Sequence, residues 1–212
     1  MDQGGVPEDQ KGALEKGATI AFVDEVGSSL KPVVARTWAR KGHTPTLRHT
    51  FNWSSLSIIG GITDDGRVFH HTHELSIRAV QVGLFLEHLR GHIAGPGGVI
   101  LDRAGIHRAK AVKSFLEREP RLEVHHLPAY APDCNPIEWL WAHIKRQLAN
   151  LCPFSLRQLK REWRSALARV RVRPGLVQSF FRTSAIDGAR ASSGRIGKVE
   201  WSRTRGPAPS GA

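Results

Sequence analysis

The chain has 212 residues, of which 40% are hydrophobic and 24% are charged, which is the size and composition of one globular domain with its own core. Lysine and arginine number 31 against 19 acidic residues, and the formal net charge of +12 suits a polyanionic partner such as nucleic acid, although a soluble basic surface or an anionic membrane would suit it too. No apolar run approaches the about 18 residues of a membrane span and the N-terminus lacks a signal-peptide pattern, so we expect a cytoplasmic protein.

Both ends of the chain have compositions typical of disorder. Residues 1–17 are rich in Gly, Glu, Lys and Gln without apolar periodicity, and residues 188–212 are rich in Gly, Ser, Arg and Pro. We therefore predict one folded domain over residues 18–187, preceded by a disordered segment and followed by a basic, disordered tail.

The first part of the folded region has the pattern of β-strands. A short apolar run over residues 18–24 ends at an aspartate, and its length and flanking glycines favour a buried strand. Residues 33–38 and 56–62 are the next strand candidates. The second of these continues through the turn sequence Asp64-Asp65-Gly66 into a strand over residues 67–71.

Helices and strands then alternate. Short strands are predicted over residues 99–102 and 122–127, and a helix is predicted from about residue 107. A last helix begins at a Ser155 and Gln158 capping-box pair. Two further helices are predicted from apolar residues at helical spacing, namely Ile77, Val80, Leu84, Phe85 and Leu89 in one and Ile137, Leu140, Trp141, Ile144 and Leu148 in the other. This order predicts an α/β fold with a mixed sheet and helices on both faces.

Three acidic residues occupy positions where a chemical site would place them. Asp24 closes the first predicted strand, Asp102 closes a later one, and Glu138 lies at the start of the helix after the last strand. The ends of neighbouring strands converge in space, so these carboxylates can meet. Clustered carboxylates repel one another unless a hard cation neutralises them, and Mg²⁺ or Mn²⁺ prefers such oxygen ligands. Two such ions could activate a nucleophile on one side of a phosphodiester and stabilise the leaving oxygen on the other.

Glu138 has a second interpretation. The sequence Asn135-Pro136-Ile137-Glu138 is also a helix start, with Asn135 as the N-cap and Glu138 completing a capping box. A carboxylate fully engaged by the cap would be a poor metal ligand. The pattern alone leaves both roles open.

Two longer motifs resemble those of a known family. Residues 101–107 read LDRAGIH and residues 127–141 read LPAYAPDCNPIEWLW. They are similar to the second and third acidic motifs of the mariner-like superfamily of transposases, especially its bacterial insertion-sequence branch, whose usual forms are L-D-N-A-x-x-H and L-P-x-Y-S-P-x-L-N-P-I-E-x-x-W. Residues 22–25 and 38–42 resemble the first motif, so the resemblance covers about residues 18–185.

The resemblance implies a ribonuclease H-like catalytic domain that cuts DNA at insertion-sequence ends and joins it to a target through two Mg²⁺ or Mn²⁺ ions. Asp24 and Asp102 would bridge or flank the ions and Glu138 would complete the site. His107 would position substrate or water, unless it only caps or packs its helix, and Asn135 would support the site. The resemblance also implies a homodimer that synapses two element ends, in a cytoplasmic, nucleoid-associated protein.

Basic side chains near such a site are candidates for contacts with the DNA backbone, and a solvated helix face is the alternative. The candidates are Arg103, Lys145, Arg146, Lys160, Arg161 and Arg164.

The chain departs from the family in two places. Arg103 stands where the family commonly has Asn, and its cation would either compete with metal for Asp102 or contact a DNA phosphate. Relatives carry a helix-turn-helix region before the catalytic domain, whereas little precedes Ala18. We therefore expect the second half of a split or truncated transposase that needs its DNA-binding half in trans. A catalytically inactive DNA-binding remnant and a host nuclease of the same fold are the alternatives.

Some residues invite a metal or stacking role that the pattern does not favour. His70, His71, His73 and Glu74 lie close in sequence, but alternation along a strand would divide them between faces, so we expect a polar strand end and no zinc site. Trp141 belongs to an apolar stripe and is expected in the core. Trp139 lies off that stripe and either stacks on a base or packs against the following helix. Cys134 and Cys152 lack metal-site spacing and are predicted to be free thiols.

Overall fold

The computed structural model describes residues 18–49, 52–127 and 134–184, so the predicted segments 1–17 and 188–212 lie outside the described residues. Its strands are β1 (Thr19–Ser29), β2 (Ser55–Thr63), β3 (Val68–His73), β4 (Gly97–Leu101) and β5 (Leu122–His126). Its helices are α2 (Ala79–His92), the 3₁₀ turn η2 (Gly105–Arg108), α3 (Lys110–Arg118), α4 (Pro136–Gln147), α5 (Leu156–Arg171) and α6 (Pro174–Thr183). None of the described helices is long and apolar enough to cross a membrane.

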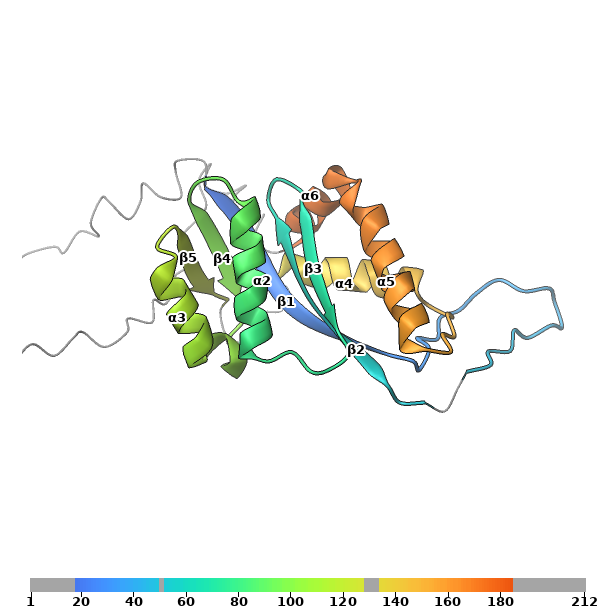
Figure 1. The fold of residues 1–212 in the computed structure, drawn as a ribbon. Helices are drawn as coiled ribbons and strands as arrows, with labels where there is room; N and C mark the ends of the chain where they lie inside the picture. Colours follow the sequence, from blue (N-terminus) through green and yellow to red (C-terminus); the bar gives the residue numbers. More distant parts are fainter. Residues whose placement is uncertain (1–17, 50–51, 128–133, 185–212) are drawn as a thin grey trace, which may run out of the picture.

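The five strands form one mixed sheet in the order β3-β2-β1-β4-β5 (Figure 1). The strands β1, β2 and β3 pair in antiparallel fashion, whereas β4 pairs parallel to β1 and β5 pairs parallel to β4. The turn predicted at residues 64–66 joins β2 to β3, and Gly66 adopts the positive φ of 91° that favours glycine in such turns. This is the mixed sheet that the sequence predicts.

Side chains alternate along β1 between two hydrophobic cores, one on each face of the sheet. Phe22 and Val26 pack in the core built with α4, α5 and α6, whereas Ala21 and Val23 pack in the core built with α2 and α3. Helices therefore cover both faces, as predicted, and a residue's position along a strand determines which helical layer it meets.

The strand β1 is longer than predicted, and this changes the place of Asp24. It pairs with β2 along residues 21–29, so Asp24 lies in the middle of a strand and does not close one. The parallel pairing with β4 includes Phe22 opposite Ile100, and β4 ends at Leu101. The same register continued by two residues brings Asp102 level with Asp24.

The strand predicted over residues 33–38 is wrong. Val34 is 74% exposed, and the segment makes no strand pairing. The strand β1 pairs with β2 along residues 21–29 and with β4 along residues 19–22, and residues 33–38 add to neither pairing. Its backbone is instead held by Asn150, whose side chain accepts from Ala35 N at 2.9 Å and donates to Ala35 O at 3.0 Å. Asn150 N also donates to Val33 O at 2.7 Å.

The helices differ from the prediction in three details. In α2 the buried stripe is Val82, Phe85, Leu86 and Leu89, whereas Val80 and Leu84, predicted to be on that stripe, are exposed. The helix α3 begins at Lys110, after the 3₁₀ turn that contains His107. The helix α6 was not predicted, although Pro174 at its start and three buried apolar residues after it are a helical pattern. Cys134 and Cys152 are free, as predicted.

Candidate active site

Asp24, Asp102 and Glu138 come from three different elements and lie in one region of the sheet, where the charges of Asp102 and Glu138 both act on Asp24. Asp24 has the same parity in β1 as Phe22 and Val26, so its side chain lies on the face that α4 covers. Asp102 directly follows β4, and Glu138 lies in the first turn of α4. The negative charges of Glu138 and Asp102 both help to raise the pKa of the Asp24 carboxyl group.

The carboxyl group of Asp24 is buried, with 7% of the residue exposed. Burial and the negative charges of Glu138, Glu25 and Asp102, partly opposed by a backbone hydrogen bond from Glu25, together raise its pKa from 3.8 to about 7, and burial is the largest cause. Trp141 Nε1 donates a hydrogen bond to Asp24 Oδ2 at 3.3 Å. Near neutral pH this group is therefore poised between its two protonation states, and a nearby cation would favour the carboxylate.

The carboxyl group of Asp102 has the opposite environment. Its Oδ1 accepts from Ala104 N at 2.8 Å and lies 2.7 Å from Nδ1 of His107. The hydrogen bond from His107 is the main reason that the pKa of Asp102 is lowered, and burial only partly opposes it. Because both donors engage Oδ1, the second oxygen of an ionised carboxylate remains to face a further positive charge.

His107 connects Asp102 to a fourth acidic residue, Glu25. The buried imidazole places Nε2 at 3.0 Å from Glu25 Oε1, with Nδ1 facing Asp102. Burial opposes the charged form, but the hydrogen bonds with Asp102 and Glu25 outweigh it and raise the pKa of His107 to about 10. His107 is therefore an imidazolium that donates from both nitrogens. Glu25 was not predicted as a site residue. It follows Asp24 in β1, so its side chain lies on the opposite face of the sheet from that of Asp24.

The structure favours one of the two interpretations of Glu138. Asn135 is the N-cap of α4, but its side chain makes no capping hydrogen bond, and Glu138 N donates to the backbone oxygen of Asn135 at 3.1 Å. No capping box forms, and the Glu138 side chain is exposed. Asn135 is buried, and its Oδ1 has no hydrogen-bond partner among the described residues. The predicted N-cap bond of Asn135 is therefore wrong, and the carboxylate of Glu138 is not engaged by the cap.

In the described contacts, the Arg103 side chain is held by the backbone just after β5. Its Nε donates to the backbone oxygen of Leu127 at 3.0 Å, which ties the guanidinium to the end of β5. The positive groups that act on the Asp102 carboxyl group are His107 and His126. The competition with metal that the sequence raised is not seen in the described contacts.

The donor set of the three acids fits a hard divalent cation. In the described part of the chain, no three His, Cys, Asp or Glu side chains could hold one metal ion together. If two ions shared one carboxylate, each would need only two carboxylates from the protein. Water and substrate oxygens would complete the coordination of each ion. The carboxylates of Asp24, Asp102 and Glu138 are oxygen donors of the kind that such an ion prefers.

The histidines of β3 divide between the two faces, as predicted. The His70 ring faces α5, where Arg171 Nη2 donates to its Nδ1 at 3.2 Å, and the His71 ring faces α2, 4.8 Å from the His88 ring. Trp141 is in the core with 2% exposed, as predicted, and Trp139 is 40% exposed.

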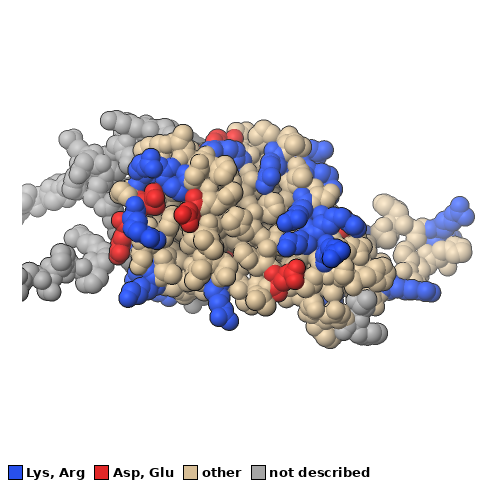
Figure 2. Space-filling view, viewed as in Figure 1, with Lys and Arg blue, Asp and Glu red and all other residues tan. Residues whose placement is uncertain are grey.

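Basic side chains gather over α5 (Figure 2). Arg161 and Arg164 are exposed on this helix, with Lys160 half-buried beside them, and Lys145 and Arg146 are exposed in the last turn of α4. Both helices belong to the layer that covers the face with the acids. The predicted positions therefore form a basic surface on that side of the sheet.

Comparisons with solved structures agree with this architecture. The Mos1 mariner paired-end complex with Mn has a TM-score of 0.58 and 19% identity, and the match covers 84% of this chain and 56% of that chain. The Mos1 transposase paired-end complex with the left transposon end has a TM-score of 0.54 and 19% identity, with 78% and 56% covered. The fold is therefore the ribonuclease H-like fold of transposase catalytic domains, and this chain spans somewhat more than half the length of those chains.

Sequence comparison gives the family. A search of curated proteins found no match. A family model described as DDE superfamily endonuclease matches residues 19–160, a range that contains Asp24, Asp102 and Glu138. The match covers more than half of the chain, and we conclude that the chain belongs to the DDE superfamily of endonucleases.

Proposed function

We propose that this chain is the catalytic domain of a DNA transposase of the bacterial insertion-sequence type. The observation that carries the proposal is a buried Asp24 on which the charges of Asp102 and Glu138 act, within a ribonuclease H-like sheet. The Mos1 transposase structures of the same fold, described as complexes with a transposon end and with Mn or Mg, support DNA as substrate and a divalent ion as cofactor.

The proposed reaction has two in-line displacements at phosphorus. In the first, a water oxygen bonds to phosphorus at the element end, and the bond to the 3′-oxygen breaks to leave a 3′-hydroxyl. In the second, that hydroxyl bonds to a target phosphorus, and a target 3′-oxygen leaves. Two Mg²⁺ or Mn²⁺ ions, when bound, would make the nucleophile more acidic and neutralise the leaving oxygen.

The residues of the chain hold the ligand oxygens of this site in place. Asp24 supplies the buried carboxylate, with one oxygen held by Trp141. Asp102 supplies a carboxylate that His107 keeps ionised, and Glu25 holds the imidazolium from its other side. Glu138 supplies an exposed carboxylate on α4, where it is accessible to substrate. In this proposal His107 and Asn135 support the site, and neither contacts the reacting atoms.

The basic surface is proposed to bind the DNA backbone. Arg161 and Arg164 lie three residues apart on α5, so both can reach consecutive phosphates of one strand. Lys160, Lys145, Arg146 and Arg103 would extend this contact. Recognition of element ends would need a further DNA-binding region, in the same chain or in trans, and synapsis of two ends would need a homodimer.

The proposal is tested by cleavage of a duplex that carries the ends of the element encoding the chain. We expect Mn²⁺-dependent nicking by the wild type, and loss of nicking in Asp102→Asn and in Glu138→Gln. The control Glu117→Gln, an exposed acid on α3, should nick normally. Undiminished nicking by the two site variants would contradict the assignment.

The same assay separates the alternatives. Salt-sensitive DNA binding without any cleavage, even with a DNA-binding half supplied, would identify an inactive remnant. Cleavage that is independent of end sequence and is never followed by strand joining would identify a nuclease.

A further inference from the structure

We infer that Trp141 is a positioning residue for Asp24, and that Gly60 provides the space in which its indole lies. The inference rests on the proposed function, because it concerns how Asp24 is held toward a divalent ion. Its starting point is the hydrogen bond from Trp141 Nε1 to Asp24 Oδ2, which measures 3.3 Å and joins two buried side chains.

The hydrogen bond fixes one oxygen of Asp24 and therefore the orientation of its carboxyl group. The indole N–H can only donate, so Oδ2 of Asp24 must be turned toward Trp141 for the bond to form. Asp102 is held in a comparable way, since His107 and Ala104 both engage its Oδ1. Each aspartate thus has one oxygen held by a donor that belongs to the protein. Partners of this kind orient ligands and tune metal affinity.

The position of Trp141 depends on the absence of a side chain at Gly60. Gly60 pairs with Asp24 across β1 and β2, so a side chain there would lie beside Asp24 on the face covered by α4. A Cβ at Gly60 would overlap Cη2 of Trp141 and would lie 3.0 Å from its Cζ2. The backbone at Gly60 does not have a positive φ, so its conformation does not require glycine. The six-membered ring of the indole fills the space that a side chain at residue 60 would take.

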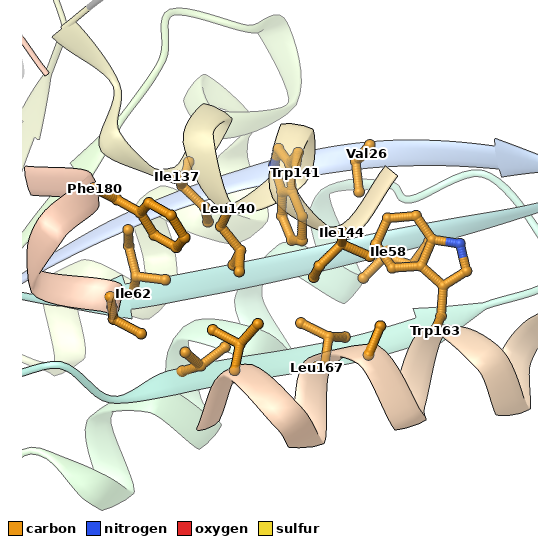
Figure 3. Close-up of a cluster of buried hydrophobic side chains, with 14 of the residues drawn as sticks. Val26, Ile58, Ile62, Ile137, Leu140, Trp141, Ile144, Trp163, Leu167 and Phe180 are labelled. Atoms are coloured by element: carbon orange, nitrogen blue, oxygen red, sulfur yellow. The ribbon is translucent and has the colours of Figure 1, made fainter. Parts of the chain in front are cut away.

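A simpler explanation is that a buried indole N–H needs any acceptor, and that Asp24 serves the core. Trp163 argues against it. This indole is equally buried, packs against Trp141 with ring centroids 6.2 Å apart, and has no hydrogen-bond partner for Nε1 among the described residues. Figure 3 shows the two tryptophans reaching into the same cluster from α4 and α5. Burial in this core therefore does not impose an acceptor, and the bond to Asp24 is specific to Trp141.

Trp163 also provides the matched control for the experiment. We compare Mn²⁺ binding by calorimetry to the full chain, to Trp141→Phe and to Trp163→Phe, after thermal unfolding has shown that both variants fold. Each variant loses one buried indole, but only Trp141→Phe loses the bond to Asp24. We expect Mn²⁺ affinity to fall by about 10-fold or more in Trp141→Phe and to stay near the wild-type value in Trp163→Phe. Equal affinities in the two variants would overturn the inference.

A second pair of variants tests the role of Gly60 without changing a carboxylate or an indole. Gly60→Ala should displace Trp141 and weaken Mn²⁺ binding as Trp141→Phe does. The control is Gly61→Ala, because a Cβ at Gly61 would lie on the opposite face, 3.3 Å from Val23 Cγ2 and 3.4 Å from Phe85 Cζ. Wild-type affinity in Gly60→Ala would overturn the role assigned to this glycine.

The outcomes for this inference and for the proposed function are distinct. Weaker Mn²⁺ binding in Trp141→Phe, with no strand cleavage by the wild type, would keep the inference and overturn the transposase function. Unchanged Mn²⁺ binding in Trp141→Phe, with a wild type that cleaves and joins DNA, would overturn the inference and keep the transposase function. No Mn²⁺ binding by the wild type would overturn both.

Discussion

Asp24 and Asp102 lie level with each other on neighbouring strands, yet the protein gives their carboxyl groups opposite environments. Asp24 is buried, is held by a neutral indole, and has a pKa raised to about 7. Asp102 is partly exposed, is held by an imidazolium, and has a lowered pKa. One site thus combines Asp102, which His107 keeps ionised, with Asp24, whose ionisation a nearby cation would favour. A metal ion at either position would therefore meet different electrostatic constraints, although both positions are aspartates in the sequence motifs.

The largest effect on stability is expected from removing His107, the group that makes the environment of Asp102 different from that of Asp24. His107→Ala would remove the imidazolium between Asp102 and Glu25 and leave two carboxylates without their partner. Loss of one partner from a fully buried ion pair costs about 3–5 kcal/mol in the free energy of unfolding, and solvent screening at the 44% exposed side chain of Asp102 should place the cost below that range; urea denaturation at pH 7 measures it. His107→Gln, which keeps one donor, should lose less. Wild-type stability in His107→Ala would mean that this contact does not hold Asp102.

Asp24→Asn is expected to stabilise the metal-free protein. The folded-state pKa of Asp24 is raised from 3.8 to about 7, so the folded protein binds its proton more tightly than the unfolded chain. Its contribution to stability is full below pH 3.8 and is lost as the pH rises through about 7. In urea denaturation with EDTA, Asp24→Asn should therefore be the more stable protein at pH 8, and the difference should shrink toward pH 4. A less stable variant at pH 8 would contradict the burial argument.

Asp102→Asn is expected to change the free energy of unfolding in the opposite direction from Asp24→Asn, and by a smaller amount. The lowered folded-state pKa of Asp102 means that its carboxylate contributes stability above its unfolded pKa, and this is lost as the pH falls through the folded-state value. Replacing it weakens a charge-assisted hydrogen bond to His107, which costs about 1–3 kcal/mol at pH 8. Urea denaturation with EDTA at the same pH values measures this loss of stability. If Asp102→Asn and Asp24→Asn shifted stability in the same direction, the contrast between the two acids would fail.

The smallest effect is expected from variants of the basic surface. None of the described contacts joins these residues to Asp24 or Asp102, and the variants should change only the binding of DNA. Arg161→Gln and Arg164→Gln should each lower the slope of log binding constant against log salt by about 1, because each removes one phosphate contact. Fluorescence anisotropy of a labelled duplex measures the slope. Arg118→Gln on α3, in the other helical layer, should leave it unchanged. Equal slopes in all three variants would move the DNA contact away from α5.

Much of the fold was predictable because apolar period and turn chemistry are local. The strands β2, β4 and β5 and the helix α4 lie close to where the patterns place them. The predicted strand over residues 33–38 failed because its backbone bonds to Asn150, a contact between residues far apart in sequence that a local apolar pattern does not reveal. The exposed Val80 and Leu84 show the same limit, since apolar residues at helical spacing do not reveal which stripe meets the sheet.

The candidate site was predictable as residue types, and its electrostatics were not. The acids Asp24, Asp102 and Glu138 stand in recognisable motifs, and the structure brings them together. The roles of Glu25 and Trp141 depend on contacts between elements far apart in sequence, namely His107 with β1 and α4 with β1. Such contacts follow from strand register and helix packing, which single-sequence patterns do not fix.

The central claim is that the three acids form a divalent-ion site, and a crystal structure of the full chain soaked in Mn²⁺ tests it most directly. The account predicts anomalous scattering peaks at about 2.2 Å from a carboxylate oxygen of Asp24, with Asp102 and Glu138 completing the protein ligands. The Trp141 Nε1 to Asp24 Oδ2 bond should remain in that structure. Manganese bound elsewhere, or no peak beside Asp24 while the three acids keep their present positions, would contradict the account.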